Sequence, residues 1–251
     1  MNNKYLQFKT KNGVLYNGNC LEIMSIMDDN QVDLIITSPP YNMRTRVRNG
    51  KYTIREYGEH FSKKYEYFND ALSIDDYYSF HKQTLSEMLR ISPIVFYNIQ
   101  IVTGSKEAIF KIIGDFNKEI KDVIVWDKGF GQPSMAKGVI NKGTELILVL
   151  EQNAKAGRQF NKSYFKRGEM QDIWRIGKGK NYEDHGACFP EKLVEEILKG
   201  WSISDNIILD PFMGSGTTAL VCEKLGRKWI GIELMQEYCE LTQQRIDNYN
   251  K

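Results

Sequence analysis

A short turn near the start of the chain presents groups that suit a planar ligand carrying an amino group. The apolar run 32–36 predicts a strand, and the residues TSPPY at 37–41 follow it directly. The two prolines fix φ and lack N–H donors, so the neighbouring carbonyls face outward as acceptors. Ser38 and Tyr41 add a hydroxyl group and a flat aromatic face. The motif alone fits equally well a proline-rich turn that closes a buried strand.

A second motif, far downstream, indicates a ligand of the nucleotide type. Residues 207–218, IILDPFMGSGTT, predict a strand, a glycine-containing loop and the start of a helix. Gly214 and Gly216 permit positive φ and a close approach of the backbone, and the helix start offers unpaired N–H groups. The run 228–233 predicts the next strand and ends in Glu233. A carboxylate in that place can accept hydrogen bonds from ribose hydroxyls.

The same loop argues against an NTPase. A phosphate-binding P-loop carries a lysine after its last glycine, whereas Thr217 and Thr218 follow Gly216 here. The dinucleotide-binding fingerprint needs a third glycine near the first helical turn, and Ala219 is only a loose substitute for it. Because Ala219 could still take that place, a nicotinamide-dependent oxidoreductase stays open as an alternative.

Alternating strand and helix patterns predict one α/β domain: a doubly wound, Rossmann-like, mostly parallel sheet with helices on both faces and inserted recognition loops. Helices are expected at 73–91, 104–116, 217–225 and 235–249, and from Pro190 to Lys199 with Gly200 as the end. Strands are expected at 94–97, 122–126 and 144–150, and at the two motifs. In such sheets ligands bind at the carboxyl ends of strands, where both motifs lie, so their strands should be neighbours.

Composition sets further limits. The chain has 251 residues, 41% of them hydrophobic, which is enough for one large core. No apolar stretch approaches the roughly 20 residues that span a bilayer, and the start MNNK lacks a signal-peptide pattern, so a cytoplasmic protein is expected. The four cysteines and three histidines are scattered without metal-ligand spacing, so neither a metal site nor a disulfide scaffold is expected.

The net charge of +2 hides two basic stretches. Residues 42–68 hold seven Lys or Arg against three Glu, residues 155–182 hold eight basic against two acidic residues, and aromatic residues are interleaved in both. Basic groups bind phosphates and aromatic rings stack on bases, so the pattern suits nucleic acid. Two solvated loops whose aromatic residues pack on the core would have the same composition.

Taken together, the two motifs resemble those of the S-adenosylmethionine-dependent amino-methyltransferases that modify exocyclic amines of DNA bases. The catalytic motif precedes the cofactor loop, as in the circularly permuted beta class of that family. Residues 18–20 (GNC), 122–128 and 185–193 (HGACFPEKL) extend the resemblance to nearly the whole chain. The resemblance implies a single circularly permuted methyltransferase domain over 1–251, with 42–68 and 155–182 as DNA-contacting, target-recognising insertions.

The resemblance also implies roles for individual residues. The catalytic residues would be Ser38, Pro39, Pro40 and Tyr41. The residues that bind S-adenosyl-L-methionine would be Asn19, His185, Phe189, Asp210, Phe212, Gly214, Ser215, Gly216, Thr217 and Glu233. The residues that contact double-stranded DNA would be Arg44, Arg46, Arg48, Lys51, Lys162, Lys166 and Arg167. A homodimer and a cognate restriction endonuclease are further expectations of this kind.

One departure from the family pattern concerns Asn19, where many members carry aspartate near the adenine of the cofactor. An amide can still donate or accept a hydrogen bond there. The sequence Asn17-Gly18-Asn19 would also form a turn without any ligand.

The chemistry implied by the resemblance is methyl transfer to a poorly nucleophilic amine. Hydrogen bonds from the amine to the Ser38 hydroxyl and the Pro39 carbonyl would favour a pyramidal nitrogen, with Tyr41 stacked on a base rotated out of the duplex. Serine at the first motif position favours cytosine N4, and adenine N6 is the alternative, because both amines offer two N–H donors. A non-catalytic nucleic-acid-binding module would fit the same basic stretches, and a methyltransferase acting on RNA or a small molecule would share the cofactor loop.

Overall fold

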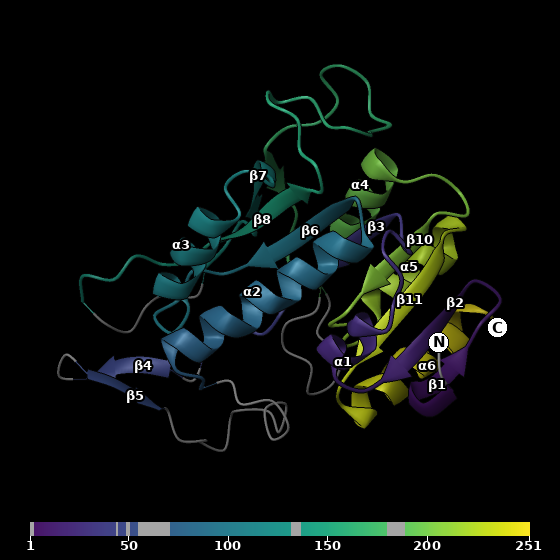
Figure 1. Ribbon diagram of the computed structural model, residues 1–251, viewed down its shortest axis with the longest axis horizontal. Coiled ribbons are helices and arrows are strands. Elements are labelled where there is room, and N and C mark those ends of the chain that lie inside the picture. The colour runs from purple at the N-terminus through teal and green to yellow at the C-terminus, as the bar shows by residue number, and fades with distance from the viewer. Residues whose placement is uncertain (1–2, 44, 49–50, 55–70, 132–136, 180–188) are drawn as a thin grey trace.

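The computed structural model describes residues 3–43, 45–48, 51–54, 71–131, 137–179 and 189–251. These residues form a nine-stranded sheet with helices on both faces and a separate two-stranded hairpin (Figure 1). The α/β class predicted from the sequence is confirmed.

The strands of the large sheet lie in the order β1-β2-β11-β10-β3-β6-β8-β7-β9. Their bounds are β1 (Leu6–Lys9), β2 (Gly13–Asn17), β3 (Leu34–Thr37), β6 (Ile94–Ile99), β7 (Ile120–Asp127), β8 (Thr144–Glu151), β9 (Ile173–Arg175), β10 (Ile207–Asp210) and β11 (Lys228–Glu233). Neighbouring strands are parallel except where β1 meets β2 and where β8 meets β6 and β7. Because β8 runs against its neighbours, its first residues lie at the edge where the parallel strands end.

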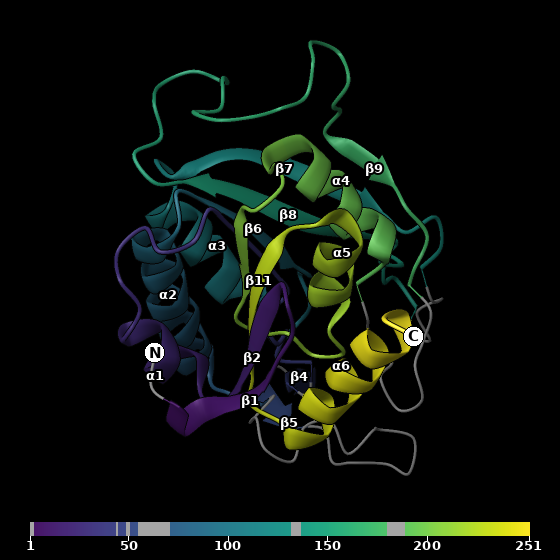
Figure 2. The ribbon, with the colours of Figure 1, turned by 90° about the vertical axis from the view of Figure 1, so that its right-hand side faces the viewer.

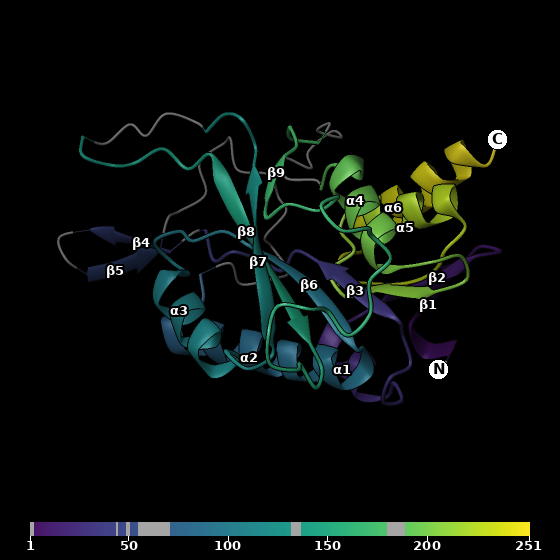
Figure 3. The ribbon, with the colours of Figure 1, turned by 90° about the horizontal axis from the view of Figure 1, so that it is seen from above.

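The helices divide between the two faces of the sheet. They are α1 (Cys20–Ser25), α2 (Ile74–Ile91), α3 (Lys106–Asp115), α4 (Glu191–Trp201), α5 (Thr217–Leu225) and α6 (Gln236–Tyr249), preceded by a short 3-10 turn at Asn3–Tyr5. Seen from above, α1, α2 and α3 cover one face and α4, α5 and α6 cover the other (Figure 3). Each face buries its own cluster of apolar side chains, so the sheet is covered on both sides.

Local signals account for the helix ends. The Ser73 hydroxyl accepts from the N–H of Asp76 at 3.1 Å and caps α2, as its sequence predicts. Gly226 adopts φ 67° and ends α5, from which the chain turns directly into β11 (Figure 2). The predicted end of α4 at Gly200 is wrong, because the helix continues to Trp201. Gly200 is buried inside the last turn, where a Cβ would lie 2.9 Å from Met170 Cε, the end of a flexible side chain.

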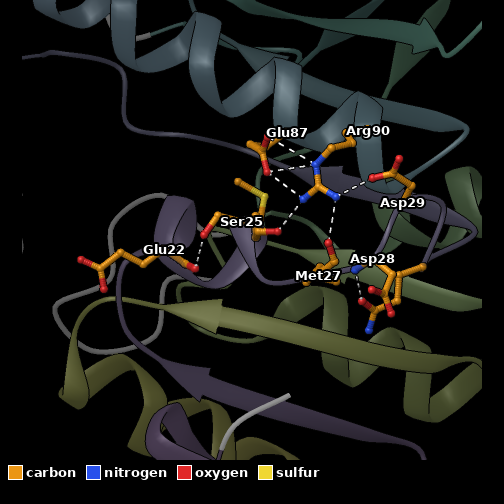
Figure 4. A network of polar contacts seen from close by, with 9 residues as sticks. Glu22, Ser25, Met27, Asp28, Asp29, Glu87 and Arg90 are labelled. Carbon is orange, nitrogen blue, oxygen red and sulfur yellow. Dashed lines mark hydrogen bonds and ion pairs between the residues drawn. The ribbon is translucent and has the colours of Figure 1, made fainter.

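An arginine on α2 fixes the loop that follows α1 (Figure 4). The Arg90 guanidinium donates to the carbonyls of Met24 and Met27, each at 2.8 Å, and to Asp29 Oδ1 at 2.7 Å. Glu87, one turn earlier on α2, accepts from the same group at 2.8 Å. These contacts hold α1 against α2 and thereby set the position of Asn19 at the start of α1.

The hairpin consists of β4 (Thr45–Arg48) and β5 (Lys51–Ile54), which pair antiparallel. It stands apart from the large sheet, near the N-terminal end of α2 (Figure 1). None of the helices that the structure describes has the length and hydropathy of a membrane span.

A glycine in β2 provides a test of the packing at the sheet. A Cβ on Gly13 would lie 2.2 Å from Trp229 Cδ2, and the Trp229 ring is held by its Nε1 donating to Glu223 Oε1 at 2.8 Å. We expect Gly13→Ala to lower the free energy of unfolding by about 1–3 kcal/mol in urea titrations. Gly114→Ala in α3 is the control, because nothing lies within 4 Å of its Cβ; it should stabilise by about 0.5–1 kcal/mol. A Gly13→Ala variant as stable as the wild type would contradict the packing.

Candidate functional site

A cavity of about 630 Å³ opens where β3 and β10 end. Its lining includes residues 38–41, which follow β3, and residues 210–215, which start at the last residue of β10. The two strands are parallel neighbours, as predicted, with Leu34 paired to Ile208 and Ile35 to Leu209. The structure therefore brings both sequence motifs to the wall of one cavity.

The loop after β10 curls around a carboxylate. Gly214 and Gly216 have φ of 53° and 79°, in the left-handed region that favours glycine. The Gly214 N–H donates to Glu233 Oε2 at 2.7 Å, and the Met235 N–H donates to Glu233 Oε1 at 2.9 Å. Burial raises the pKa of Glu233, and the two N–H groups oppose that rise. Each Glu233 oxygen keeps a lone pair, so the residue can still accept from a ligand in the cavity.

Asp210, at the end of β10, is engaged inside the protein. Its Oδ1 accepts from Thr37 Oγ1 at 2.8 Å and from the Phe212 N–H at 3.1 Å, and its Oδ2 accepts from Thr218 Oγ1 at 2.7 Å. Burial raises the pKa of Asp210 to about 6. These contacts tie the end of β3, the loop and the first turn of α5 together. Asp210 thus positions the loop, and it also lines the cavity.

Ser215 and Thr217 are buried at the cavity wall and share one partner. Arg245 Nη1, from α6, donates to Ser215 Oγ at 3.1 Å and to Thr217 Oγ1 at 3.2 Å. A Cβ on Gly216 would lie 2.5 Å from Thr242 Cγ2 on the same helix. Helix α6 therefore supports the whole glycine loop from behind.

The remaining cofactor candidates lie on different parts of the wall. Asn19 lines the cavity, but its Oδ1 caps α1 by accepting from the Leu21 N–H at 2.9 Å, which leaves the amide nitrogen for a ligand. Phe212 and Phe189 line the cavity too and provide apolar surface. His185 lies outside the described residues.

The turn at 38–41 is held rigidly from the side of α2. The Tyr77 hydroxyl donates to the Pro40 carbonyl at 2.8 Å. Asn42, with φ 57°, donates through Nδ2 to the carbonyls of Leu72 and Gly104 at 3.0 and 2.8 Å. The turn is thus fixed before any ligand arrives.

His81, for which the sequence suggested no role, packs beside this turn against Tyr77, with 4.1 Å between ring centroids. Burial lowers the pKa of His81 to about 3, so its imidazole is neutral at neutral pH. We assign it to the support of the turn.

Five polar side chains, which we call the polar cluster, form a continuous network at the wall of the cavity: Ser38, Tyr41, Asn98, Lys128 and Glu145. Ser38 Oγ lies 2.6 Å from the Tyr41 hydroxyl, which donates to Glu145 Oε2 at 2.9 Å. Asn98 Nδ2 donates to the Tyr41 hydroxyl and to Glu145 Oε2, each at 2.6 Å. Lys128 Nζ lies 2.9 Å from Glu145 Oε1.

Sequence reasoning found two of these five residues and missed Asn98, Lys128 and Glu145. Asn98 could have been noticed as a polar residue in the apolar run 94–99. Lys128 follows one predicted strand and Glu145 starts the next. The two residues are brought together by the antiparallel pairing of β7 with β8, and the sequence indicated only that residues 144–150 could pair with a neighbouring hairpin segment.

The predicted DNA-contacting residues fall in two different places. Arg46, Arg48 and Lys51 lie on the β4–β5 hairpin, and Arg44 lies outside the described residues. Lys162, Lys166 and Arg167 are exposed in the loop between β8 and β9, which appears at the top of Figure 1.

That β8–β9 loop lies at the opposite edge of the sheet from the cavity. The Asn161 N–H donates to Glu151 at the end of β8, and the Tyr164 N–H donates to the Gly200 carbonyl, at 2.8 Å in both cases. Phe160 and Phe165 pack on Trp201 with ring centroids 5.3 and 4.9 Å apart. Phe160 and Phe165 are therefore packed on the core, whereas Tyr164 is exposed. The structure does not bring Lys162, Lys166 and Arg167 to the cavity.

A third segment, not singled out from the sequence, does reach the cavity. The β7–β8 connection projects on the same side as the β4–β5 hairpin (Figure 3). Val139, Ile140 and Lys142 from it line the cavity mouth, as does Lys178 after β9. Ile140 is 83% exposed. The available signal was charge, because residues 128–143 contain three lysines and no acidic residue.

In the described part of the chain no group of His, Cys, Asp or Glu side chains is arranged to hold a metal ion. Cys20, Cys222 and Cys239 are free and buried.

Comparisons with known proteins agree with this geometry. A family model described as DNA methylase matches residues 32–244, which include both motifs. The type II methyltransferase M2.MboI of Moraxella bovis is 28% identical over 96% of this chain and 90% of its own length. The type II methyltransferase M.ScaI of Streptomyces caespitosus is 27% identical over 96% of this chain and 83% of its own length.

Two solved structures show the same fold. A cytosine-N4-specific PvuII DNA methyltransferase superposes with a TM-score of 0.72 at 20% identity, covering 97% of this chain and 89% of that chain. A complex of M1.HpyAVI with SAM superposes with a TM-score of 0.58 at 22% identity, covering 92% of this chain and 98% of that chain.

The fold is the Rossmann-like sheet that these solved structures share with this chain. More specifically, the chain belongs to the DNA methylase family of N6 and N4 amino-methyltransferases.

The role of Asp210 predicts a pH dependence of stability. Its pKa is raised from 3.8 to about 6 in the folded protein, so ionisation costs stability as the pH rises through that window. Urea titrations should show the wild type losing up to about 3 kcal/mol relative to Asp210→Asn between pH 4 and pH 7. Asp247→Asn, which removes an exposed carboxylate on α6, is the control. A difference between wild type and Asp210→Asn that does not change with pH would refute the role.

Proposed function

We propose that the protein transfers a methyl group from S-adenosyl-L-methionine to the exocyclic amine of a base flipped out of double-stranded DNA, with cytosine N4 as the favoured amine. The observation that carries the proposal is that Ser38 and Gly214 line one cavity. An amine held at the first and a methyl donor held at the second would meet within it. Membership of the DNA methylase family supports the reaction class.

The residues present fit the cofactor. The N–H groups at the start of α5 and the two left-handed glycines suit a polar, charged ligand, and Glu233 can accept from ribose hydroxyls. Phe212 and Phe189 can cover an adenine ring, and the Asn19 amide nitrogen can donate to it. When bound, S-adenosyl-L-methionine supplies an electrophilic methyl group, so the chain needs no nucleophile of its own.

The chain's own task is to orient the amine and exclude water. The fixed turn would present the Ser38 hydroxyl and the Pro39 carbonyl to the two N–H groups of the base, and Tyr41 would stack on its ring. Both hydrogen bonds strengthen as positive charge develops on the nitrogen, so they stabilise the transition state more than the ground state.

The choice of cytosine N4 is supported by serine at the first position of the 38–41 motif. The cytosine-N4-specific name of the PvuII structural neighbour points the same way. Digestion of methylated DNA to nucleosides tests it: N4-methylcytosine is expected, and N6-methyladenine as sole product would assign the protein to the alternative amine.

Duplex DNA as the partner is supported by the mouth of the cavity. Lys142 and Lys178 provide positive charge there, and Val139 and Ile140 provide exposed apolar side chains that can fill the space left by a flipped base. The β4–β5 hairpin, with the predicted DNA-contacting residues Arg46, Arg48 and Lys51, projects on the same side as the β7–β8 connection (Figure 3).

The same proposal includes a cytoplasmic location, since the proposed substrate is DNA. It also includes a cognate restriction endonuclease, since M2.MboI and M.ScaI are named type II methyltransferases. A homodimer is also proposed, and light scattering of the purified protein measures it.

Removal of the Ser38 hydroxyl tests the catalytic turn. We expect Ser38→Ala to lower the single-turnover rate of methyl transfer roughly 100-fold, as for the loss of one transition-state hydrogen bond. Calorimetric affinity for S-adenosylhomocysteine should not change. Ser25→Ala, on the exposed side of α1, is the matched control. Full activity of Ser38→Ala would exclude the mechanism. If the wild-type protein bound NAD and did not bind S-adenosylhomocysteine, the result would favour the oxidoreductase.

Paired lysine variants test which edge of the sheet meets DNA. Lys142→Gln combined with Lys178→Gln should weaken duplex binding at least tenfold and reduce the log–log salt slope by about 2, because two phosphate contacts are lost. Lys162→Gln combined with Lys166→Gln, at the far edge, should leave both quantities unchanged. The reverse result would place DNA at the β8–β9 loop. RNA and single-stranded DNA as competitors measure selectivity for the duplex.

A further inference from the structure

A serine beside an amine must accept a hydrogen bond to assist the proposed transfer. A hydroxyl group both donates and accepts, and its hydrogen rotates to suit its surroundings. If the Ser38 hydrogen pointed into the cavity, it would oppose the N–H groups of the base. The protein therefore needs a means of directing that hydrogen away from the cavity.

The polar cluster sets this direction. A carboxylate only accepts, so the Tyr41 hydroxyl gives its single hydrogen to Glu145 Oε2, 2.9 Å away. The Tyr41 oxygen must then be the acceptor in its 2.6 Å contact with Ser38 Oγ. The Ser38 hydrogen consequently points at Tyr41, and a lone pair of Ser38 Oγ remains for an incoming donor.

Lys128 and Asn98 hold the carboxylate in place. The Lys128 and Glu145 side chains are only 8% and 11% exposed, so their 2.9 Å ion pair is shielded from water. Asn98 donates to both Tyr41 and Glu145. The reverse orientation of its amide would put Asn98 Oδ1 against a carboxylate oxygen, so these contacts determine the orientation.

Asn98 also contacts Ser38 directly. Its Nδ2 donates to Ser38 Oγ at 3.4 Å, a longer contact than its two 2.6 Å bonds to Tyr41 and Glu145. This contact uses one lone pair of Ser38 Oγ and leaves the other for an incoming donor.

We propose that Glu145, paired with Lys128, is a positioning residue that makes Ser38 a hydrogen-bond acceptor by fixing the direction of the chain Ser38–Tyr41–Glu145. Neither Glu145 nor Lys128 touches the amine; both act through the Tyr41 hydroxyl. The inference rests on the proposed function, and it explains how a serine can serve where a carboxylate would accept without assistance.

Single-turnover methyl transfer with saturating S-adenosylmethionine and duplex DNA tests the inference. Glu145→Gln introduces an amide that can donate to Tyr41 and reverse the chain, so the rate should fall roughly tenfold to a hundredfold with unchanged affinity for both substrates. Glu195→Gln, which removes an ion-paired carboxylate on the distant helix α4, should have no effect. Lys128→Met should slow transfer, and Lys128→Arg should restore most of the rate because it keeps the positive charge.

A double-mutant cycle separates this role from a merely structural one. Tyr41→Phe keeps the ring and removes the hydroxyl through which Glu145 acts. Tyr41→Phe combined with Glu145→Gln should therefore be no slower than the slower single variant. Additive losses would mean that Glu145 acts by another route and would overturn the inference.

The remaining outcomes are also decisive. An unchanged rate in Glu145→Gln overturns the inference and leaves the proposed function intact. A loss that is matched by weaker substrate binding or by a lower melting temperature overturns it as well, because Glu145 would then support the fold. A wild-type protein that methylates no DNA refutes the proposed function itself.

Discussion

The parallel pairing of β3 with β10 sets the position of the groups in the cavity. Thr37 and Asp210 are 173 positions apart in sequence, yet the pairing brings the strand ends together so that they share a 2.8 Å hydrogen bond. From that junction the proline turn departs on one side and the glycine loop on the other. Because Asp210 also binds the first turn of α5 through Thr218, a shift of either strand would move both loops at once.

Each side of the cavity is then supported by different elements. Helix α6 holds the glycine loop through Arg245 and Thr242, and helix α2 holds the proline turn through Tyr77. Both loops are held in place before any ligand binds. This matters for methyl transfer, because such an enzyme acts mainly by aligning the two reactants. Tyr77, Thr242 and Arg245, which hold the two loops in place, lie outside both motifs in the sequence and belong to no recognisable motif.

The sequence predicted well the features that depend on local interactions. Helix α2 follows from its apolar spacing and its Ser73 cap, β11 from its apolar run, and the shared cavity from the rule that ligands bind at strand ends. It was less accurate where distant packing decides. The sequence places the end of α4 at Gly200, whereas the helix runs to Trp201, and Phe160 and Phe165 of the second basic stretch pack on Trp201. Charge and composition do not reveal which edge of a sheet a loop will occupy.

The antiparallel pairing of β8 with β6 and β7 has a further consequence. Lys128 and Glu145 stand at the two stems of the β7–β8 connection, where the Lys128 N–H also donates to the Gly143 carbonyl at 2.9 Å. Residues 139–142 of that connection line the cavity. On the proposed function, DNA that contacts these residues would press on the same hairpin whose stems carry the Lys128–Glu145 ion pair. Binding of the duplex and orientation of Ser38 would then be coupled through that hairpin.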